Sequence, residues 1–524
     1  MTAFSLFHLP TFGLKTQNVT SPSILKAGFA AMLAFGARFE TPPPERLDEG
    51  SLGGILVGIP SHEKFHSLSM QFLDAAIDEC GDEPPSLCLL QVAILITFYQ
   101  LIQGVRGRAW RSLGLCVRMA YELGLHQVDS GEPYRQAPES TDSITRWCFD
   151  EERRRAWWAI WEMDSFASTI RRCPTAIDWT ENETCLPVAN QFWFNSQFHR
   201  SCYLERKPVE RLKALTRCGN ESPTAWLIVV LSLVTEAHFL SKPKVPLTLH
   251  GPRASITMQS SRPQSTDVAD RLAVVSNALH CFFLALPEPL RYRNEYLDFE
   301  TAEARKLHSA KFSIHVMRQL ATLMAYRSTT SNDNDPDHQG HRRFIEASDN
   351  VFAIVKNSAE DHVRHVNPFL ASTVWFAAAV QLAHRFGAAP GSNTDLVESK
   401  FELLRMNCQQ YAKFWATPDA LLENLSALEA HLAAQRGAAR PSPGNENWAN
   451  EGQLCATPLG SHSCSAVPVS GNRYPPGDGH QNGLESFTAD DDALTSLNLD
   501  MDFGLEPSGM SFGLDGLHFD GHAT

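Results

Sequence analysis

The residues best suited to metal binding in this 524-residue sequence are its twelve cysteines. A binuclear zinc cluster needs thiolate pairs two residues apart, so that both sulfurs reach one metal ion. No Cys-x-x-Cys pair occurs in the sequence, and the closest two cysteines are Cys80 and Cys88. The spacing excludes a binuclear zinc cluster within this sequence. Because the chain is long and shows no secretory signal, the cysteines are expected to be reduced intracellular thiols. Four cysteines are expected to serve as small core residues: Cys116, Cys148, Cys281 and Cys408.

Three aspartates at alternate positions, Asp333, Asp335 and Asp337, match the start of a calcium-binding loop. Such a loop also needs a glycine at its sixth position and a glutamate at its twelfth. Those positions hold His338 and Phe344. We therefore interpret the run as a solvated acidic turn.

A second candidate metal site is formed by His362 and His365, which lie one helical turn apart beside Asp361. No third ligand is indicated, and histidines in the last turn of a helix favour its negative dipole end. No Gly-x-Ser-x-Gly elbow, phosphate-binding loop or His-Glu-x-x-His pair is present. The sequence therefore predicts no metal, no cofactor and no catalytic residue.

Two stretches with helical periodicity carry the most distinctive residues. In residues 108–126 the apolar side chains, Trp110 among them, share one face of a helix. Gly114 is predicted to let a neighbouring helix approach closely, and Gly124 suits a helix C-terminus.

The second stretch, residues 151–164, holds three glutamates, three arginines and three tryptophans. Glu151 and Glu152 suit the start of a helix. Each buried tryptophan removes about 200 Å² from water. Arginines followed at once by core tryptophans make a poor nucleic-acid surface, so we expect them to form ion pairs with nearby acids.

These stretches resemble the middle homology region of fungal binuclear zinc-cluster transcription factors, including the subset related to xylanolytic activators. That family shows a helix ending in Met-Ala-x-x-Leu-Gly-Leu-His, then Glu-x-Arg-Arg-Arg-x-Trp-Trp, an Asp and a Gly-Arg-Pro turn. The matching positions taken as family motif residues are Trp110, Gly114, Arg118, Met119, Gly124, Leu125, His126, Arg153, Arg154, Arg155, Trp157, Trp158, Asp164 and Pro174.

The match covers residues 5–190 directly, and this sequence departs from the family in three places. Cys116 replaces the usual alanine, and Ser165 follows the motif aspartate where arginine is common. The Gly-Arg-Pro turn reads Arg172-Cys173-Pro174. The zinc cluster that normally precedes the region is also missing from the sequence.

The resemblance and the apolar periodicity together predict an all-α fold, a large multi-helix regulatory domain over residues 1–435 with a disordered C-terminal tail. Residues 128–145, 241–266 and 328–341 are predicted to be loops. Helices are expected near residues 22–38, 62–80, 86–103, 107–125, 151–170, 223–240, 267–285, 307–324, 342–364, 368–386, 397–415 and 418–435.

The C-terminal residues have a different composition. Residues 436–483 are rich in glycine and proline, which is typical of a disordered linker. Residues 484–524 hold nine carboxylates and no lysine or arginine, with too few apolar side chains to offset the entropy of ordering. This mixture is typical of activation domains, although an inert solubilising tail is the alternative. The candidate activation residues are Phe487, Leu494, Leu497, Leu499, Phe503, Phe512, Leu514 and Phe519.

The formal net charge of −14 argues against wide contact with nucleic-acid phosphates. No apolar run approaches the roughly 18 residues of a membrane span. The longest, residues 92–99 and 226–234, are expected to be buried helices, and no membrane partner is expected.

The resemblance implies a nuclear transcription regulator and not an enzyme. The implied partners are proteins: the transcription machinery, a zinc-cluster partner or a second copy. Contact with DNA would be indirect or would need an N-terminal module absent from this sequence, and any small effector is unidentified. Two alternatives stay open, namely a truncated gene model of a complete zinc-cluster factor and an all-helical metal-dependent enzyme. The second would need acidic motifs on core helices.

Overall fold

The computed structural model describes residues 4–39, 60–131, 140–241, 265–327, 339–387 and 394–438. These ranges fold into fifteen α-helices, with short 3₁₀ turns and an isolated parallel bridge between Leu297 and Ser358. The predicted all-α fold is confirmed. The acidic turn at residues 333–337 and the tail at residues 484–524 lie outside the described residues.

The first half of the chain contains α1 (Leu9–Asn18), α2 (Pro22–Gly36), α3 (His62–Cys80), α4 (Leu87–Ile102), α5 (Gly107–Glu122), α6 (Thr141–Arg171), α7 (Asn190–Phe194) and α8 (Pro208–Cys218). The second half contains α9 (Pro223–Leu240), α10 (Ser265–Ala285), α11 (Ala302–Tyr326), α12 (Gln339–Lys356), α13 (Leu370–Gly387), α14 (Thr394–Trp415) and α15 (Ala420–Ala438).

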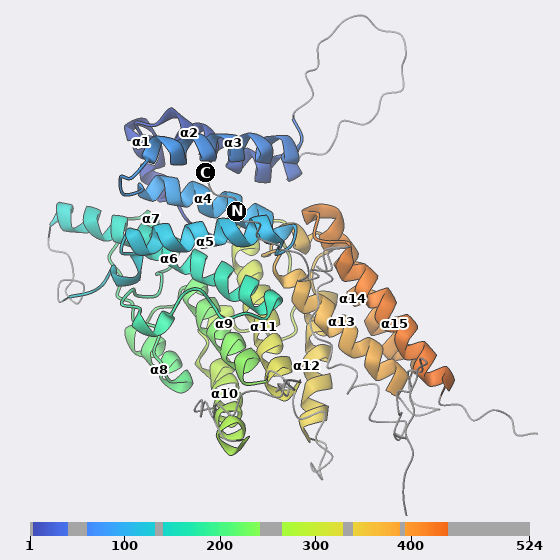
Figure 1. The fold of residues 1–524 in the computed structure, drawn as a ribbon. Coiled ribbons are helices and arrows are strands. Elements are labelled where there is room, and N and C mark those ends of the chain that lie inside the picture. The colour runs from blue at the N-terminus through green and yellow to red at the C-terminus, as the bar shows by residue number, and fades with distance from the viewer. Residues whose placement is uncertain are drawn as a thin grey trace, which may run out of the picture.

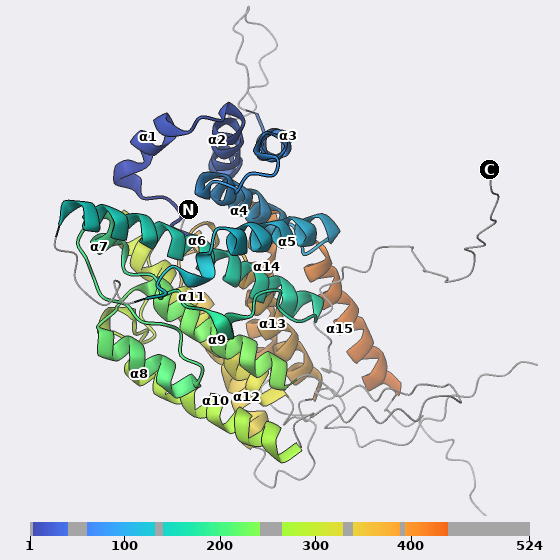
Figure 2. The ribbon, with the colours of Figure 1, turned by 60° about the vertical axis from the view of Figure 1, so that its left-hand side comes forward.

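Helix α6 lies near the centre of this arrangement, where it contacts α4, α5 and α9 (Figures 1 and 2). Helices α1 to α4 cover one end of the molecule, and α13 to α15 form a bundle along one side. Helices α9 and α11 pack against each other below α6.

Most helices follow the predicted boundaries, but the start of α6 does not. It begins at Thr141, ten residues before the predicted start, so the prediction of a loop through residue 145 was wrong. Ser140 caps the start of α6, because its side chain and that of Ser143 satisfy each other's backbone N–H groups in a capping box. Helices α1, α7 and α8 were not predicted.

Small side chains let α2 approach its neighbours closely. The buried face of α2 is mostly alanine with Gly28. A Cβ atom added at Gly28 would lie 3.1 Å from the Val92 side chain of α4. Close packing of α2 against α4 therefore depends on the missing side chain at this position.

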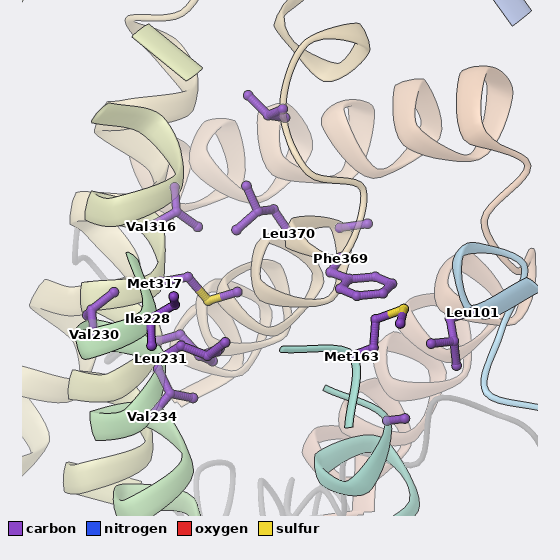
Figure 3. Packing of buried hydrophobic residues seen from close by; sticks show 14 of the residues in the cluster. Leu101, Met163, Ile228, Val230, Leu231, Val234, Val316, Met317, Phe369 and Leu370 are labelled. Carbon is purple, nitrogen blue, oxygen red and sulfur yellow. The ribbon is translucent and has the colours of Figure 1, made fainter. Parts of the chain in front are cut away.

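Apolar side chains from helices far apart in the sequence meet in one core. Figure 3 shows Leu101 of α4, Met163 of α6 and Phe369, which precedes α13, converging on one region, with Ile228 of α9 and Met317 of α11 nearby. The core thus joins both halves of the chain.

Helices α9 and α10 are longer apolar segments than the sequence analysis recognised. Over Pro223–Leu240 the mean hydropathy is 1.5, and over Asp267–Ala285 it is 1.3, so both meet the length and composition of a membrane span. Within the fold 67 % of the first window is buried, but only 22 % of the second. The predicted apolar run at residues 226–234 is the centre of α9, which packs on α11 as a core helix.

Candidate functional site: buried ion pairs on the tryptophan helix

The second family motif lies in the middle of α6, where nearly every side chain is buried. Glu151 and Glu152 were predicted to start a helix, and this was wrong, because ten helical residues precede them. Both glutamates are at most 2 % exposed. Buried carboxylates need compensating partners, and the neighbouring arginines supply part of that compensation.

Arg154 joins α6 to the turn that follows the first motif. Its Nε donates to Asp129 Oδ2 at 2.8 Å and its Nη2 donates to the other carboxylate oxygen. Its Nη1 donates to Glu151 at 3.3 Å. Burial opposes the charged form, but the hydrogen bonds and charge of Asp129 raise the pKa of Arg154. Asp129 also accepts the backbone N–H of Cys185 at 2.8 Å, so one carboxylate holds two separate segments.

Arg155 performs the same role for the segment before α7. It donates to Glu151 Oε1 at 2.9 Å, to Asn190 Oδ1 at 2.6 Å and to the Val188 carbonyl at 2.6 Å. Its guanidinium lies 4.1 Å from the ring centroid of Trp193. Burial lowers the pKa of Arg155, and the charge of Glu151 opposes that shift.

Glu152 fastens the N-terminal segment to α6. It pairs with Lys15 of α1 and accepts a hydrogen bond from Gln91 of α4 at 3.2 Å. Gln91 donates further to the Leu6 carbonyl at 2.7 Å, and His8 lies 3.0 Å from the Trp193 carbonyl. Sequence spacing offers no signal for these contacts, because Lys15 and Glu152 are 137 positions apart.

The arginine run is therefore internal, and the prediction that it forms ion pairs with nearby acids is confirmed. Arg153 is the most exposed of the three, and it binds Asp150 at 3.3 Å and the Leu123 carbonyl at 3.1 Å. These guanidinium groups already have partners, so the run offers little to DNA phosphates.

The tryptophans of α6 form the apolar counterpart of this network. Trp157, Trp158 and Trp161 are each at most 2 % exposed. Trp158 donates to the Cys185 carbonyl at 2.8 Å. Trp110 of α5 is half-buried, and the guanidinium of Arg171 lies 5.4 Å from its ring centroid. The expectation that these side chains anchor the helices is met most fully on α6.

The first family motif divides between core and surface. Met119 and Leu125 are buried, whereas Arg118 is exposed. His126 is half-buried, and its ring lies 5.0 Å from that of Tyr121 and 6.1 Å from that of Trp157. The motif histidine therefore contributes to an aromatic cluster between α5 and α6.

The two motif glycines have different structural roles. Gly124 follows α5 with φ of 63°, in the left-handed region predicted for a helix C-terminus. Gly114 is exposed, and a Cβ atom there would meet nothing within 4 Å. The prediction of close helix approach at Gly114 was therefore wrong.

Alanine substitutions should separate these roles. Gly124→Ala should destabilise the fold by about 1–2 kcal/mol, because a side chain is strained in the left-handed region. Gly114→Ala should stabilise it by about 0.5–1 kcal/mol, because alanine has the higher helix propensity and space is available. Urea unfolding of both variants measures the difference, and equal effects would contradict this assignment.

Asp164 and the turn after α6 complete the second motif. Asp164 is 1 % exposed and accepts the Ile177 N–H at 2.9 Å. Arg172 ends the helix with φ of 55°, a conformation in which glycine is favoured. Arg172, which stands where the family has glycine, thus adopts a left-handed conformation, and Pro174 beyond it is exposed.

Glu162 is a buried acid that the sequence analysis did not identify. It is 6 % exposed and accepts a hydrogen bond from Asn367 at 2.7 Å. Burial raises its pKa to about 8, and the Asn367 hydrogen bond opposes the shift. The acid is therefore largely neutral in the folded protein at neutral pH.

This shift predicts a pH-dependent stability. The folded-state pKa lies above the unfolded value, so the folded state holds a proton that the unfolded state loses between about pH 4.5 and 8. Stability contributed by neutral Glu162 is present below that window and is lost as pH rises through it. From pH 5 to pH 8, the unfolding free energy of Glu162→Gln should rise relative to that of the wild type by on the order of 2–4 kcal/mol. A constant difference in unfolding free energy across this range would contradict the assignment.

His362 and His365 were predicted to lie in the last turn of a helix, and this was wrong. Helix α12 ends at Lys356, and His362 lies in a 3₁₀ turn. His362 is buried between the Ala359 carbonyl at 2.7 Å and Asn407 at 3.2 Å, and burial lowers its pKa to about 4. Within the described part of the chain, no three His, Cys, Asp or Glu residues form a group able to hold a metal ion.

The geometry defines an all-helical scaffold in which buried ion pairs and tryptophans join the N-terminal segment, α5, α6 and the segment around α7. A family described as the fungal specific transcription factor domain matches residues 2–282, which is more than half of the chain. The chain therefore belongs to the fungal specific transcription factor domain family.

Curated relatives agree with this membership. The ascochitine biosynthesis cluster transcriptional regulator of Didymella fabae is 26 % identical over 158 residues, which cover 30 % of this chain and 26 % of the relative. The citrinin biosynthesis transcriptional activator ctnR of Monascus purpureus is 21 % identical over 287 residues, covering 54 % and 44 %. The Zn(2)-C6 fungal-type transcription factor FTF1c of Fusarium oxysporum f. sp. lycopersici is 27 % identical over 193 residues, covering 36 % and 19 %. The matches span less than half of these relatives, and no solved structure matches the chain significantly.

Proposed function

We propose that this chain is a nuclear transcription regulator in which a helical domain over residues 1–435 supports protein contacts and an acidic tail engages the transcription machinery. Family membership over residues 2–282 carries the proposal. The internal arginine run supports the role of α6 as a scaffold rather than a DNA-binding surface.

We propose that DNA recognition is supplied by residues that are not in this sequence. The sequence contains no Cys-x-x-Cys pair, which a binuclear zinc cluster needs. We propose a partner protein that carries such a cluster. A second candidate is a longer protein of which this chain is the regulatory part, since the matches span less than half of the relatives and one relative is named a Zn(2)-C6 factor.

The tail is proposed to be the activating segment. Its nine carboxylates keep apolar side chains in solvent until a partner groove accepts them. Residues 436–483 would then act as a linker that lets the tail reach that partner.

A reporter assay with the whole chain tests this proposal. The chain is joined to a foreign DNA-binding domain, and output is measured from a promoter with the matching site. We expect activation that is mostly lost when Leu494, Leu497 and Leu499 become alanine. The control replaces Thr495, Ser496 and Asn498 with alanine and should keep activity. Silence of the unaltered fusion, despite its accumulation in the nucleus, would reject the activating role.

A small apolar cavity among the described residues could in principle hold an effector. It measures about 40 Å³ and lies between the end of α4, the end of α6, residues 368–372 and residues 417–421. A small-molecule site usually needs roughly 300 Å³ or more. The cavity therefore provides no basis for naming an effector, and catalysis is not proposed.

A further inference from the structure

Two cysteines outside the family motifs lie beside each other at the base of α8. Cys218 is the last residue of α8, and Cys202 belongs to the extended segment that precedes this helix. Neither cysteine forms a disulfide, and their thiols are close enough that each shifts the pKa of the other. Cys218 Sγ also donates to the Leu215 carbonyl at 3.3 Å. Both residues are half-buried.

Hydrogen bonds on both sides hold the two cysteines in this position. The Cys202 carbonyl accepts the Leu186 N–H at 2.8 Å. Ser201 precedes Cys202, and its Oγ accepts a hydrogen bond from Asn220 Nδ2 at 2.9 Å. The same Asn220 amide also donates to the Pro187 carbonyl at 3.1 Å. Asn220 is 2 % exposed. A buried side chain thus links the segment of Cys202 directly to the turn that follows Cys218.

The surroundings make the two thiols chemically unequal. The hydrogen bond from Cys202 lowers the pKa of Cys218 to about 7, with help from the Asn220 N–H and the charge of Arg200, whereas burial opposes the shift. The same hydrogen bond, together with burial, raises the pKa of Cys202. By contrast, burial raises the pKa of Cys408 in the core to about 12. Cys218 is therefore the nucleophile of the pair, and Cys202 is the neighbouring thiol.

We propose that Cys202 and Cys218 form a reversible oxidation site that closes to a disulfide when the protein meets a hydroperoxide. The proposal rests on the neighbouring positions of the two cysteines, their partial exposure and the hydrogen bonds that join their segments. The proposal is independent of the role in transcription.

The chemistry balances with hydrogen peroxide as the two-electron oxidant. The Cys218 thiolate attacks one peroxide oxygen, so that an S–O bond forms, the O–O bond breaks and hydroxide leaves. The Cys202 sulfur then attacks the sulfenic sulfur, an S–S bond forms and the S–O bond breaks. The departing hydroxide takes the Cys202 proton, and the first hydroxide becomes water with a proton from solvent. The net change is two thiols and one peroxide to one disulfide and two waters, and a dithiol reductant reverses it.

Peptide mapping of the full chain tests the proposal. The folded protein is treated with hydrogen peroxide at pH 7, free thiols are alkylated and the chain is digested with trypsin. Cleavage after Arg200, Arg206 and Arg217 places the two cysteines on separate peptides. We expect a cross-linked pair containing Cys202 and Cys218 that disappears on reduction. Without peroxide, Cys218 should be alkylated about tenfold faster than the half-buried Cys281, because its neighbour Cys202 lowers the pKa of Cys218 and favours the thiolate.

Single substitutions distinguish oxidation of the Cys202–Cys218 pair from general oxidation of cysteines. In Cys202→Ser the cross-link should be lost, and a sulfenic-acid reagent should label Cys218. Cys408→Ser should leave the cross-link unchanged. Folding of each variant is checked by circular dichroism, and the wild-type map decides the question even if a variant fails to fold. Equal alkylation of Cys218 and Cys281 together with no Cys202–Cys218 cross-link, or a cross-link that instead joins Cys185, would overturn the proposal.

Discussion

Replacing Arg154 with methionine should destabilise the fold by about 3–5 kcal/mol. The substitution keeps most of the side-chain volume but leaves Asp129 and part of Glu151 without their cation. Asp129 is 2 % exposed and Glu151 is fully buried, so water cannot replace the lost guanidinium. Urea unfolding followed by circular dichroism measures the change, with loss of soluble protein as the extreme result.

The adjacent arginine offers a matched control. Arg153→Met makes the same chemical change one residue earlier, at a side chain that is 26 % exposed and paired with a 24 % exposed Asp150. Partly exposed ion pairs contribute about 0–1 kcal/mol. A similar cost for both variants would show that helix propensity or a general loss of charge, rather than the buried network, decides stability here.

The second large effect is expected at Trp157. Trp157→Ala should cost about 3–5 kcal/mol, because the side chain is fully buried on α6 and its removal leaves a cavity in the main core. Its ring lies 5.6 Å from that of Tyr121, so the loss should also loosen α5 against α6. Equilibrium unfolding gives the free energy, and hydrogen exchange of α5 amides reports the local loosening.

Trp110→Ala provides the comparison for this result. Trp110 is half-buried at the edge of α5, and we expect roughly half the cost of the Trp157 substitution. If Trp110→Ala proved the more damaging change, the assignment of α6 as the central anchor would be wrong.

The reporter result and the stability results address different parts of the proposal. The Arg154 and Trp157 variants should lose activity only as far as they lose folded protein, because neither side chain is on the surface. The tail variants should lose activity at unchanged stability. A folded Arg154 variant without reporter activity would indicate that the network does more than support the fold.

Apolar periodicity was sufficient to locate the long helices. Helix α3 runs from His62 to Cys80 and α9 from Pro223 to Leu240, as the spacing predicts. Such helices have a strong local signal, since their apolar side chains recur every three or four residues. Helices α1 and α8 have ten and eleven residues and mixed composition, and neither was predicted because short segments carry weak periodicity.

By itself, the sequence determined the family, the helical class, the buried tryptophans and the expectation that the arginines pair with acids. Only the tertiary structure decided which acids those are. Glu151 lies four positions from Arg155, but Asp129 is 25 positions from Arg154, and Lys15 is 137 from Glu152. The physical reason is range: helix periodicity acts between neighbours along the chain, whereas the partner of a buried charge is set by which segments the folded core brings within hydrogen-bond distance.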